Sequence, residues 1–346
     1  MNNNIKPGRR KFLVNGLTVL AGSALVTPSL FGAPSILKNY NKPNSKINGV
    51  QIGVITYSFR SMEDQSAEAI LKYVLESGVS AIELMGDPAE AFAGKPNNPV
   101  DSQSFRGLNR AKKQGKLSRD QEKELADLQA QMDSYTNEVA EWRSKVSMDA
   151  FAKLRKMYND AGVTIYAFKP SAFKKGNTDA EISWGMKTAK TLGASHVTVE
   201  HPSDDAHTLR LGTLAKKHGI YVGYHGHEQQ TPTLWDTALA QSQFNAMNLD
   251  LGHYVAAGNA NPLQIIKDKH TLIKSMHLKD RQNVAHGKGN LVWGSGDTPI
   301  AEALQLMRKN KYNFPGTVEL EYGIPEGSNA IAEVQKCLAF CEQALG

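Results

Sequence analysis

The 346-residue chain has only two cysteines, Cys337 and Cys341, which lie four residues apart in an expected C-terminal helix. Neighbours on one helix face hold their Cβ vectors nearly parallel, which is poor geometry for a disulfide bond. We therefore expect two free thiols. The sequence contains neither a disulfide framework nor a cysteine-based metal motif.

Acidic residues are absent from the first 38 positions. That segment holds five basic residues, and the whole chain has 40 Lys and Arg against 34 Asp and Glu, a formal charge of +6. Without the segment the balance is 35 against 34, or +1. Nucleic-acid binders rely on clustered Lys and Arg to release counterions from phosphates. A body so near neutrality argues against a nucleic-acid partner.

Long hydrophobic runs are also absent, apart from one short stretch over residues 12–26. This stretch follows the basic residues Arg9-Arg10-Lys11 and precedes the small residues of 32–35. The order resembles a twin-arginine export signal. We predict a signal peptide over residues 1–35, export to the periplasm, and no stable membrane span after cleavage. An uncleaved membrane anchor is the alternative.

A glycine-rich dinucleotide-binding loop is missing after the first expected strand, where residues 54–59 read Val-Ile-Thr-Tyr-Ser-Phe. What the chain has instead is a repeated alternation of short apolar strands and amphipathic helices. The absent loop disfavours a doubly wound sheet, which is the alternative fold. We predict a (β/α)8 TIM barrel over residues 48–346. Its expected strands cover residues 50–57, 79–85, 163–168, 194–200, 220–225, 246–251, 272–278 and 316–321.

The expected helices follow from apolar residues at helical spacing. Residues 65–77, for example, place apolar side chains at 67, 70, 71, 74 and 75, and Gly78 is the C-cap candidate. The other expected helices end near Gly162, cover 179–192 and 205–218, begin at Pro262 and at Pro299, and cover 328–344.

Residues 87–147 interrupt this alternation between the second and third strands. They begin as a loop rich in Pro, Gly and Asn, and a polar helix is expected over 118–145, with Ser118 and Gln121 as a capping box. The segment is either a solvated helical insertion or a lid or oligomer arm above the catalytic face. An oligomer arm would make the protein a homo-oligomer, whereas a lid would not.

Polar side chains end five consecutive expected strands, from the fourth to the eighth. Active sites of TIM barrels lie at these carboxyl ends. Converging carboxylates are costly to bury and raise one another's pKa, and a divalent cation removes that cost. A mixture of Glu, Asp and His suits Mn, Co, Zn or Fe(II) better than Ca. The candidate site residues at the ends of these five strands are Glu200, His225, His227, Asp250, His253, His277, Lys279, Glu319 and Glu321.

Strand alternation places Glu319 and Glu321 on the same side of the last strand. Glu321 lies nearer the open end and is therefore the better expected ligand. Glu319, one layer deeper, is expected to support a ligand or to belong to the core.

Four motifs along residues 50–345 together resemble the xylose isomerase-like TIM-barrel superfamily, which includes sugar phosphate isomerases and epimerases. They are Asp250-Leu-Gly-His253, Met-His277-Leu-Lys279-Asp280, Gly294-Ser-Gly296-Asp297 and Val-Glu319-Leu-Glu321.

The resemblance implies that Asp250, His277 and Glu321 are metal ligands, with manganese the favoured ion. It implies that His253 binds substrate. The family's fourth ligand is usually a Glu at the end of the fifth strand, where this chain has His225. Either His225 itself or Glu200, from the fourth strand, fills that role.

The implied activity is metal-dependent isomerisation or epimerisation by enolisation of a keto sugar. In an exported protein we expect that sugar to be a 3-keto-glycoside. Glu200 or Glu321 is the expected base. The expected proton donors and substrate-binding groups, including a Trp that could stack on a sugar ring, are His227, His253, Lys279 and Trp293.

Three other functions compete with this one. Loss of a β-substituent after enolisation would make the protein a 3-keto-glycoside lyase or hydratase. A broken metal site would leave a non-catalytic periplasmic carbohydrate-binding barrel. A phosphodiesterase like endonuclease IV needs further His ligands on the second and third strands, and neither strand supplies one.

Overall fold

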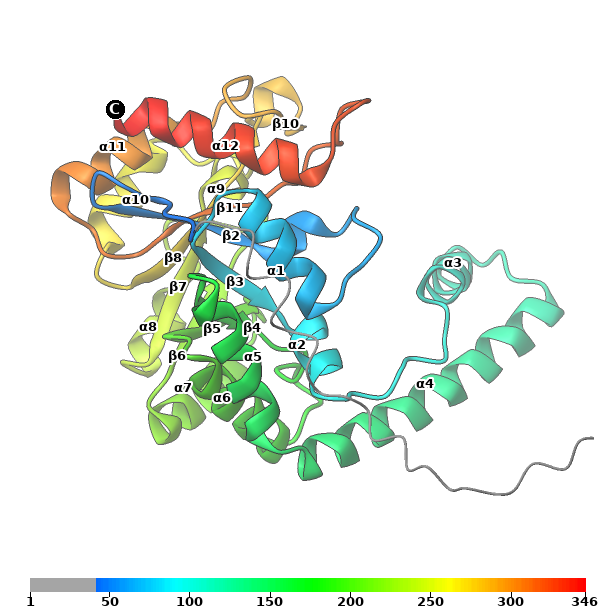
Figure 1. Cartoon of the computed structure of the whole chain (residues 1–346). Helices are drawn as coiled ribbons and strands as arrows, with labels where there is room; N and C mark the ends of the chain where they lie inside the picture. The colour runs from blue at the N-terminus through cyan, green and yellow to red at the C-terminus, as the bar shows by residue number, and fades with distance from the viewer. Residues whose placement is uncertain (1–41) are drawn as a thin grey trace, which may run out of the picture.

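The computed structural model describes residues 42–346, and the predicted signal peptide lies outside them. Eight parallel strands form a closed barrel, since β2 pairs with both β3 and β11. This closure confirms the TIM barrel and excludes the open, doubly wound sheet (Figure 1). The barrel strands are β2 (Val50–Ile55), β3 (Ala81–Met85), β4 (Thr164–Lys169), β5 (His196–Glu200), β6 (Tyr221–His225), β7 (Asn245–Asp250), β8 (Ile273–Leu278) and β11 (Gly316–Val318).

The sequence located all eight strands, and the largest difference is at the end of β11. We expected that strand to reach residue 321, but its ladder with β8 stops at Val318. Glu319 still donates its backbone N–H to the carbonyl of Leu278, at 3.1 Å. The chain therefore stays beside β8 as it leaves the ladder.

The strand register brings the polar strand ends to nearly the same height. Glu200 of β5 lies opposite His225 of β6, and Asp250 of β7 lies opposite His277 of β8. Parallel strands expose their carboxyl ends at one face of a barrel. The register therefore gathers these four residues at that face.

Helices cover the outside of the barrel. The first, α1, buries the five apolar positions that the sequence predicted; Ser66 caps its start, and Gly78 follows its end with φ +77°. The barrel helices are α1 (Ala67–Glu76), α5 (Met148–Asp160), α6 (Asp179–Leu192), α7 (Asp205–His218), α8 (Asp236–Gln241), α9 (Leu251–Ala256), α10 (Pro262–Lys269), α11 (Ile300–Asn310) and α12 (Ala330–Leu345).

The remaining short elements lie before the barrel and in its loops. They are β1 (Lys46–Ile47), η2 (Thr56–Phe59), β9 (Asp280–Arg281), η3 (Val284–His286) and β10 (Asn290–Leu291). Cys337 and Cys341 are free and buried in α12, as predicted. Among residues 42–346, no helix is both long and apolar enough to cross a bilayer.

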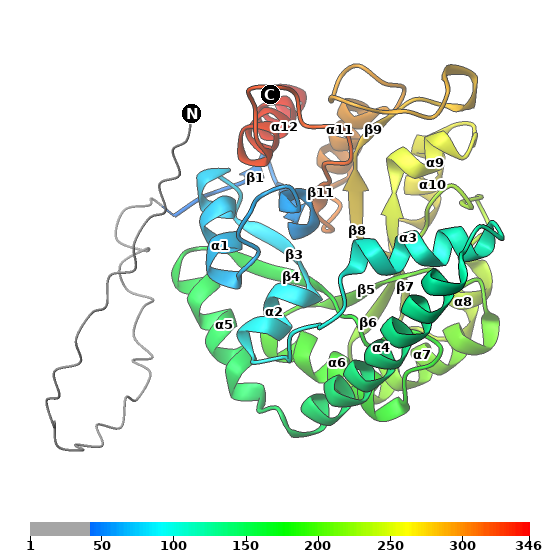
Figure 2. The same ribbon diagram turned by 90° about the vertical axis from the view of Figure 1, so that its right-hand side faces the viewer.

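The insertion between β3 and α5 contains three helices, α2 (Gly86–Phe92), α3 (Ser102–Lys113) and α4 (Arg119–Lys145). Ser118 and Gln121 form the predicted capping box of α4. The loop that the sequence predicted around Pro88 is wrong, because these residues begin the helix α2. Pro88 lies in the first turn of that helix, where its missing N–H costs no helical hydrogen bond. Figures 1 and 2 show α3 and α4 projecting on the side toward which the β3 arrow points.

Candidate active site

A buried imidazole lies at the centre of the barrel's carboxyl-terminal face. The Nδ1 atom of His277 is 2.8 Å from Oε2 of Glu319, and its Nε2 atom is 2.8 Å from Oε2 of Glu83. Burial alone lowers the pKa of His277, but the charges of Glu83 and Glu319 outweigh burial and raise this pKa to about 10. In the metal-free protein His277 is therefore an imidazolium held between two carboxylates.

The ammonium of Lys279 lies among three carboxylates beside that ring. Its Nζ atom is 2.7 Å from Glu319, 2.9 Å from Glu321 and 3.0 Å from Asp250. Burial lowers the pKa of Lys279, but the charges of Asp250, Glu319 and Glu321 outweigh it and raise the pKa above its usual range. Burial in turn raises the pKa of Asp250. Lys279 thus supplies positive charge where three anionic groups converge.

Four buried side chains offer donor atoms to a metal ion at this place. One atom from each of His225, Asp250, His277 and Glu319 lies within 4.8 Å of the others. Oδ2 of Asp250, the atom nearest the Lys279 ammonium, is 3.9 Å from both Nε2 of His225 and Nδ1 of His277. Two ligands of one ion, each bound at about 2.0–2.2 Å, can stand this far apart.

The hydrogen bonds of His225 leave one of its nitrogens free for a metal. Its Nδ1 is 2.7 Å from the amide oxygen of Asn248, which can only accept, so Nδ1 carries the proton. The Asn248 amide nitrogen donates to Oε2 of Glu83, at 3.4 Å, and a carboxylate oxygen can only accept, which supports this orientation. Burial keeps the pKa of His225 well below its usual value, so the ring is neutral. Its Nε2 lone pair is therefore available, as expected of a metal ligand.

These residues fit a divalent cation, and they favour His225 over Glu200 as the fourth ligand. Binding would require His277 to lose its Nδ1 proton and Lys279 to move from between the carboxylates. Glu83 would then accept from the Nε2–H of His277, an arrangement common for metal-bound histidines. Glu319, expected one layer deeper, belongs to the group within 4.8 Å, and Glu321 lies at its edge, beside Lys279.

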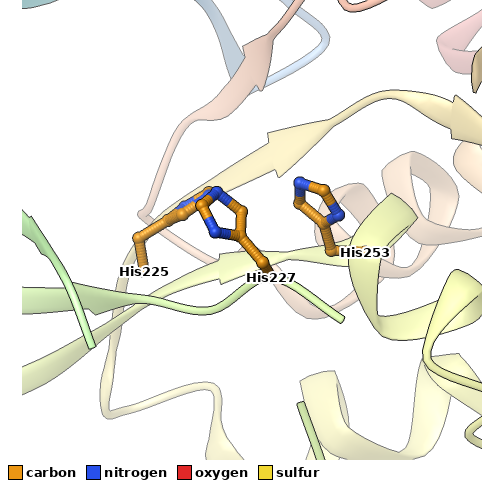
Figure 3. Close-up of side chains that lie close together, drawn as sticks. All are labelled: His225, His227 and His253. Carbon is orange, nitrogen blue, oxygen red and sulfur yellow. The ribbon is translucent and has the colours of Figure 1, made fainter. Parts of the chain in front are cut away.

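A second group of donors consists of three histidines, His225, His227 and His253, whose rings lie close together (Figure 3). Arg281 donates from Nη1 to Nδ1 of His253, because a guanidinium can only donate. The neutral His253 ring must then carry its proton on Nε2, and it has no lone pair left for a metal. Burial lowers the pKa of His253 to about 3, which keeps it neutral. His253 is thus a hydrogen-bond donor, and the three histidines are not a complete ligand set.

The outer part of the site is more open. Glu200 has a side chain that is 50% exposed; it forms an ion pair with Lys169 at 2.6 Å and is 3.5 Å from Nε2 of His227. It belongs to neither group of donors. Glu321 follows β11, which lies across the barrel from β5, and its carboxylate is 3.7 Å from Nε2 of His253.

Trp293 does not join the predicted site residues. Its ring packs edge-on against Phe340 of α12, at 5.7 Å, and no described hydrogen bond links it to the residues above. The Gly294-Ser-Gly296 motif, which follows Trp293 directly, has a structural role. The carboxylate of Asp280 accepts hydrogen bonds from the backbone N–H groups of Gly294, Ser295 and Gly296. The Gly-Ser-Gly motif thus anchors the loop after β8.

Sequence reasoning missed three supporting residues, Glu83, Asn248 and Arg281. Glu83 is the one polar residue of β3, and Asn248 lies between the apolar residues Met247 and Leu249 of β7. Both are readable signals, because burying such groups needs a partner. Arg281 follows the Lys279-Asp280 pair directly. Its contact with His253 depends on how β9 meets α9, and no local pattern shows that.

Comparison with known proteins gives the fold. No family model and no curated protein matches the chain. A sugar phosphate isomerase/epimerase from Parabacteroides distasonis has a TM-score of 0.53 at 18% identity, over 84% of this chain and 93% of that one. The 3-keto-D-glucoside 4-epimerase YcjR from E. coli, in its apo form, has a TM-score of 0.55 at 11% identity, over 85% and 99%.

A xylose isomerase-like TIM-barrel protein from Mycobacterium smegmatis, in complex with magnesium, has a TM-score of 0.51 at 14% identity, over 86% and 96%. Because the identities are this low, these structures establish the fold of the chain and nothing more. That fold is the xylose isomerase-like TIM barrel.

Proposed function

We propose that the protein is a divalent-metal-dependent enzyme that enolises a keto sugar. The observation that carries the proposal is the buried group of donors from His225, Asp250, His277 and Glu319 at the carboxyl end of the barrel. The two neighbours named as a sugar phosphate isomerase/epimerase and a 3-keto-D-glucoside 4-epimerase support this class of reaction.

His225, Asp250, His277 and one of the two glutamates, Glu319 or Glu321, would hold the ion. When bound, it would act as a Lewis acid toward a carbonyl and the adjacent hydroxyl oxygen of the sugar. Manganese is our first choice, because mixed nitrogen and oxygen ligands suit a transition metal.

The chain's own residues would move the proton. Glu321 is the proposed base for the hydrogen α to the carbonyl, because its side chain is 22% exposed against 7% for Glu319. The Nε2–H of His253 and the ammonium of Lys279 would donate hydrogen bonds to the oxygen on which negative charge develops. Glu200 and His227, on the opposite side, are candidates for returning a proton.

The outcome depends on where the proton returns. Its return to the same carbon from the other face gives epimerisation, and its return to the neighbouring carbon gives isomerisation. Loss of a β-substituent instead gives a lyase. We propose a 3-keto-glycoside as substrate, which is the substrate class of the E. coli neighbour.

One observation favours a second candidate, a non-catalytic carbohydrate-binding barrel. Lys279 already compensates the three carboxylates without an ion, at 2.7–3.0 Å. If that arrangement persists in the presence of metal, the enolisation chemistry has no Lewis acid.

The deciding experiment is α-proton exchange in deuterated water, followed by NMR. The protein is first loaded with Mn, Co, Zn or Mg, and then incubated with 3-keto-glucosides and with free ketohexoses. We expect metal-dependent exchange with the first panel. If neither panel exchanges with any of the four ions, although the ion binds, the enzyme proposal is wrong.

The proposal also includes export to the periplasm through residues 1–35, which the described residues do not cover. Replacing both Arg9 and Arg10 with Lys should leave the protein in the cytoplasmic fraction. The homo-oligomer expected from the insertion stays a prediction.

A further inference from the structure

Two neighbouring cavities lie beside the outer part of the site and the helical insertion. The first, of about 380 Å³, lies between the loops after β4 and β5, and its wall includes Lys169 and Glu200. The second, of about 520 Å³, lies against α2 and α4, and its wall includes Arg143. Ser171 and Lys174 line both cavities. The loop after β4 therefore forms part of both walls, and the two cavities lie on the way from the Lys169–Glu200 ion pair to the insertion.

Most charges in the wall of the second cavity are compensated within the chain; Lys174, at the side shared with the first cavity, has no described ion pair. Lys95 pairs with Asp87 at 2.6 Å and with Glu90 at 3.2 Å. Arg143 pairs with Glu181 at 3.0 Å and lies 3.7 Å from Glu90. Such a wall offers an ionic ligand little net attraction.

The uncharged part of the same wall is rich in hydrogen-bonding groups. Amides and hydroxyls that can both donate and accept suit a ligand with many hydroxyl groups. They belong to Asn97, Asn98, Ser102, Tyr135, Thr136, Ser171 and Asn177.

Arg143 supplies an independent sign of a ligand. It is 8% exposed, it lines the second cavity, and its Nε atom makes no hydrogen bond. A buried donor without a partner costs about 1–3 kcal/mol, and an acceptor on a ligand or an ordered water would remove that cost. The guanidinium also lies over the ring of Trp184, at 5.3 Å.

We propose that the two cavities are sugar subsites, so that the substrate is a neutral glycoside with at least one sugar unit beyond the reacting ring. The insertion supplies the outer subsite. Both volumes fall in the range of ligand pockets, about 300–1,000 Å³. The identity of the reacting ring rests on the proposed function, but binding at the outer subsite does not.

The test is a binding titration with cellobiose, maltose, trehalose and glucose, by calorimetry and by tryptophan fluorescence. Trp142 and Trp184 lie 5.5 Å apart beside Arg143 and should report the outer subsite. We expect at least one disaccharide to bind at least tenfold more tightly than glucose. Failure of every disaccharide to exceed glucose would overturn the proposal.

The same titration with Asp250→Asn separates this proposal from the enzyme proposal. The variant lacks the proposed metal ligand, but it keeps both cavities. Disaccharide binding that survives in Asp250→Asn supports the subsites even if the protein shows no proton exchange with any substrate. Binding that disappears with the metal ligand would contradict subsites outside the metal centre.

A variant in the wall tests the location. Asn97→Ala should weaken disaccharide binding about three- to tenfold, as expected for one lost hydrogen bond, and leave glucose binding unchanged. Asn109→Ala, in α3 of the same insertion, lines neither cavity and is the matched control. Equal effects of the two variants would contradict the proposed outer subsite.

Discussion

The site has two layers of ionisable side chains, and they differ in how they are held. In the inner layer, Asp250, His277, Lys279 and Glu319 are buried, and each lies within 4 Å of an oppositely charged partner. In the outer layer, Glu200 is half exposed, with Lys169 as its close ion-pair partner.

This difference indicates a division of roles. A buried and mutually compensated group is held in place by its neighbours, so it can keep the geometry that metal binding needs. An exposed group can change partners when a substrate arrives. We therefore assign ion binding to Asp250, His277 and Glu319 of the inner layer. Lys279, once displaced by the ion, would contact the substrate together with the outer layer.

The largest expected effect comes from removing charge in the inner layer. Asp250→Asn should abolish stoichiometric metal binding and lower activity at least about 10³-fold, because a Lewis acid contributes several kcal/mol of transition-state stabilisation. The Asn side chain can still cap α9, as Asp250 does through the N–H of His253.

Elemental analysis and proton-exchange rates measure both effects. Asp101→Asn, at the cap of α3, lines neither cavity; it is the matched control and should keep metal and activity. Full metal content in Asp250→Asn would contradict the assignment of the inner layer.

The second prediction concerns the fourth ligand. His225→Gln should lower the affinity for the ion at least about tenfold, because it removes a ligand nitrogen. Glu200→Gln should leave the metal content unchanged, since this carboxylate lies outside the donor group. Competition with a chelating dye measures both affinities. If Glu200→Gln lowered the affinity and His225→Gln did not, Glu200 would be the fourth ligand, and the outer layer would take part in ion binding.

The third prediction tests the tautomer of His253. Arg281→Met removes the donor to Nδ1, and kcat should fall about 10²-fold, as for the loss of a proton-donating group. Metal content should not change. Nitrogen NMR of the His253 ring should show a loss of the Nε2–H form, whereas Arg210→Met, which breaks a guanidinium bridge elsewhere, should not. An unchanged NMR signature would contradict the role of Arg281.

The fourth prediction concerns Glu83, beneath His277. Glu83→Gln should weaken metal binding about 10- to 100-fold, as other losses of a hydrogen-bond partner of a metal-bound His do. Glu90→Gln removes another buried glutamate, from α2, and should leave the affinity unchanged. Equal affinities in the two variants would mean that Glu83 serves folding alone.

The last prediction leaves the metal chemistry untouched and concerns stability, through His196 in the barrel interior. Burial lowers the pKa of His196 to about 4, below its usual 6.5. The unfolded chain therefore binds more protons at His196 between these pH values. The contribution of His196 to stability is full above pH 6.5 and falls as the pH drops toward 4. The shift corresponds to about 3 kcal/mol.

Melting temperatures between pH 4 and 7 measure this loss. His196→Gln should show a flatter profile. Thr317→Val removes the barrel hydrogen bond to Tyr166 but no group that titrates in this window, so it should keep the original slope. A profile of His196→Gln that is as steep as that of the unmodified protein would show that other groups carry the acid sensitivity.

Much of the fold could be predicted, because it depends on local patterns. The stripe of apolar residues in α1 shows which face of that helix is buried. The left-handed Gly193 after α6 shows where that helix ends. The helix α2 was missed because Pro88 reads as a breaker unless its place in the first turn is known. The strand ends also pointed to the charged face, since the carboxyl ends of barrel strands always meet.

The sequence by itself determined the barrel and the polar strand ends, because alternation and spacing are properties of the chain. Only the tertiary structure decided which polar groups pair. Lys279 lies among three carboxylates, and Arg281 sets the tautomer of His253, because residues far apart in the chain meet there. Pairing depends on distances of a few ångströms between strands and loops, and these distances exist only once the barrel has closed.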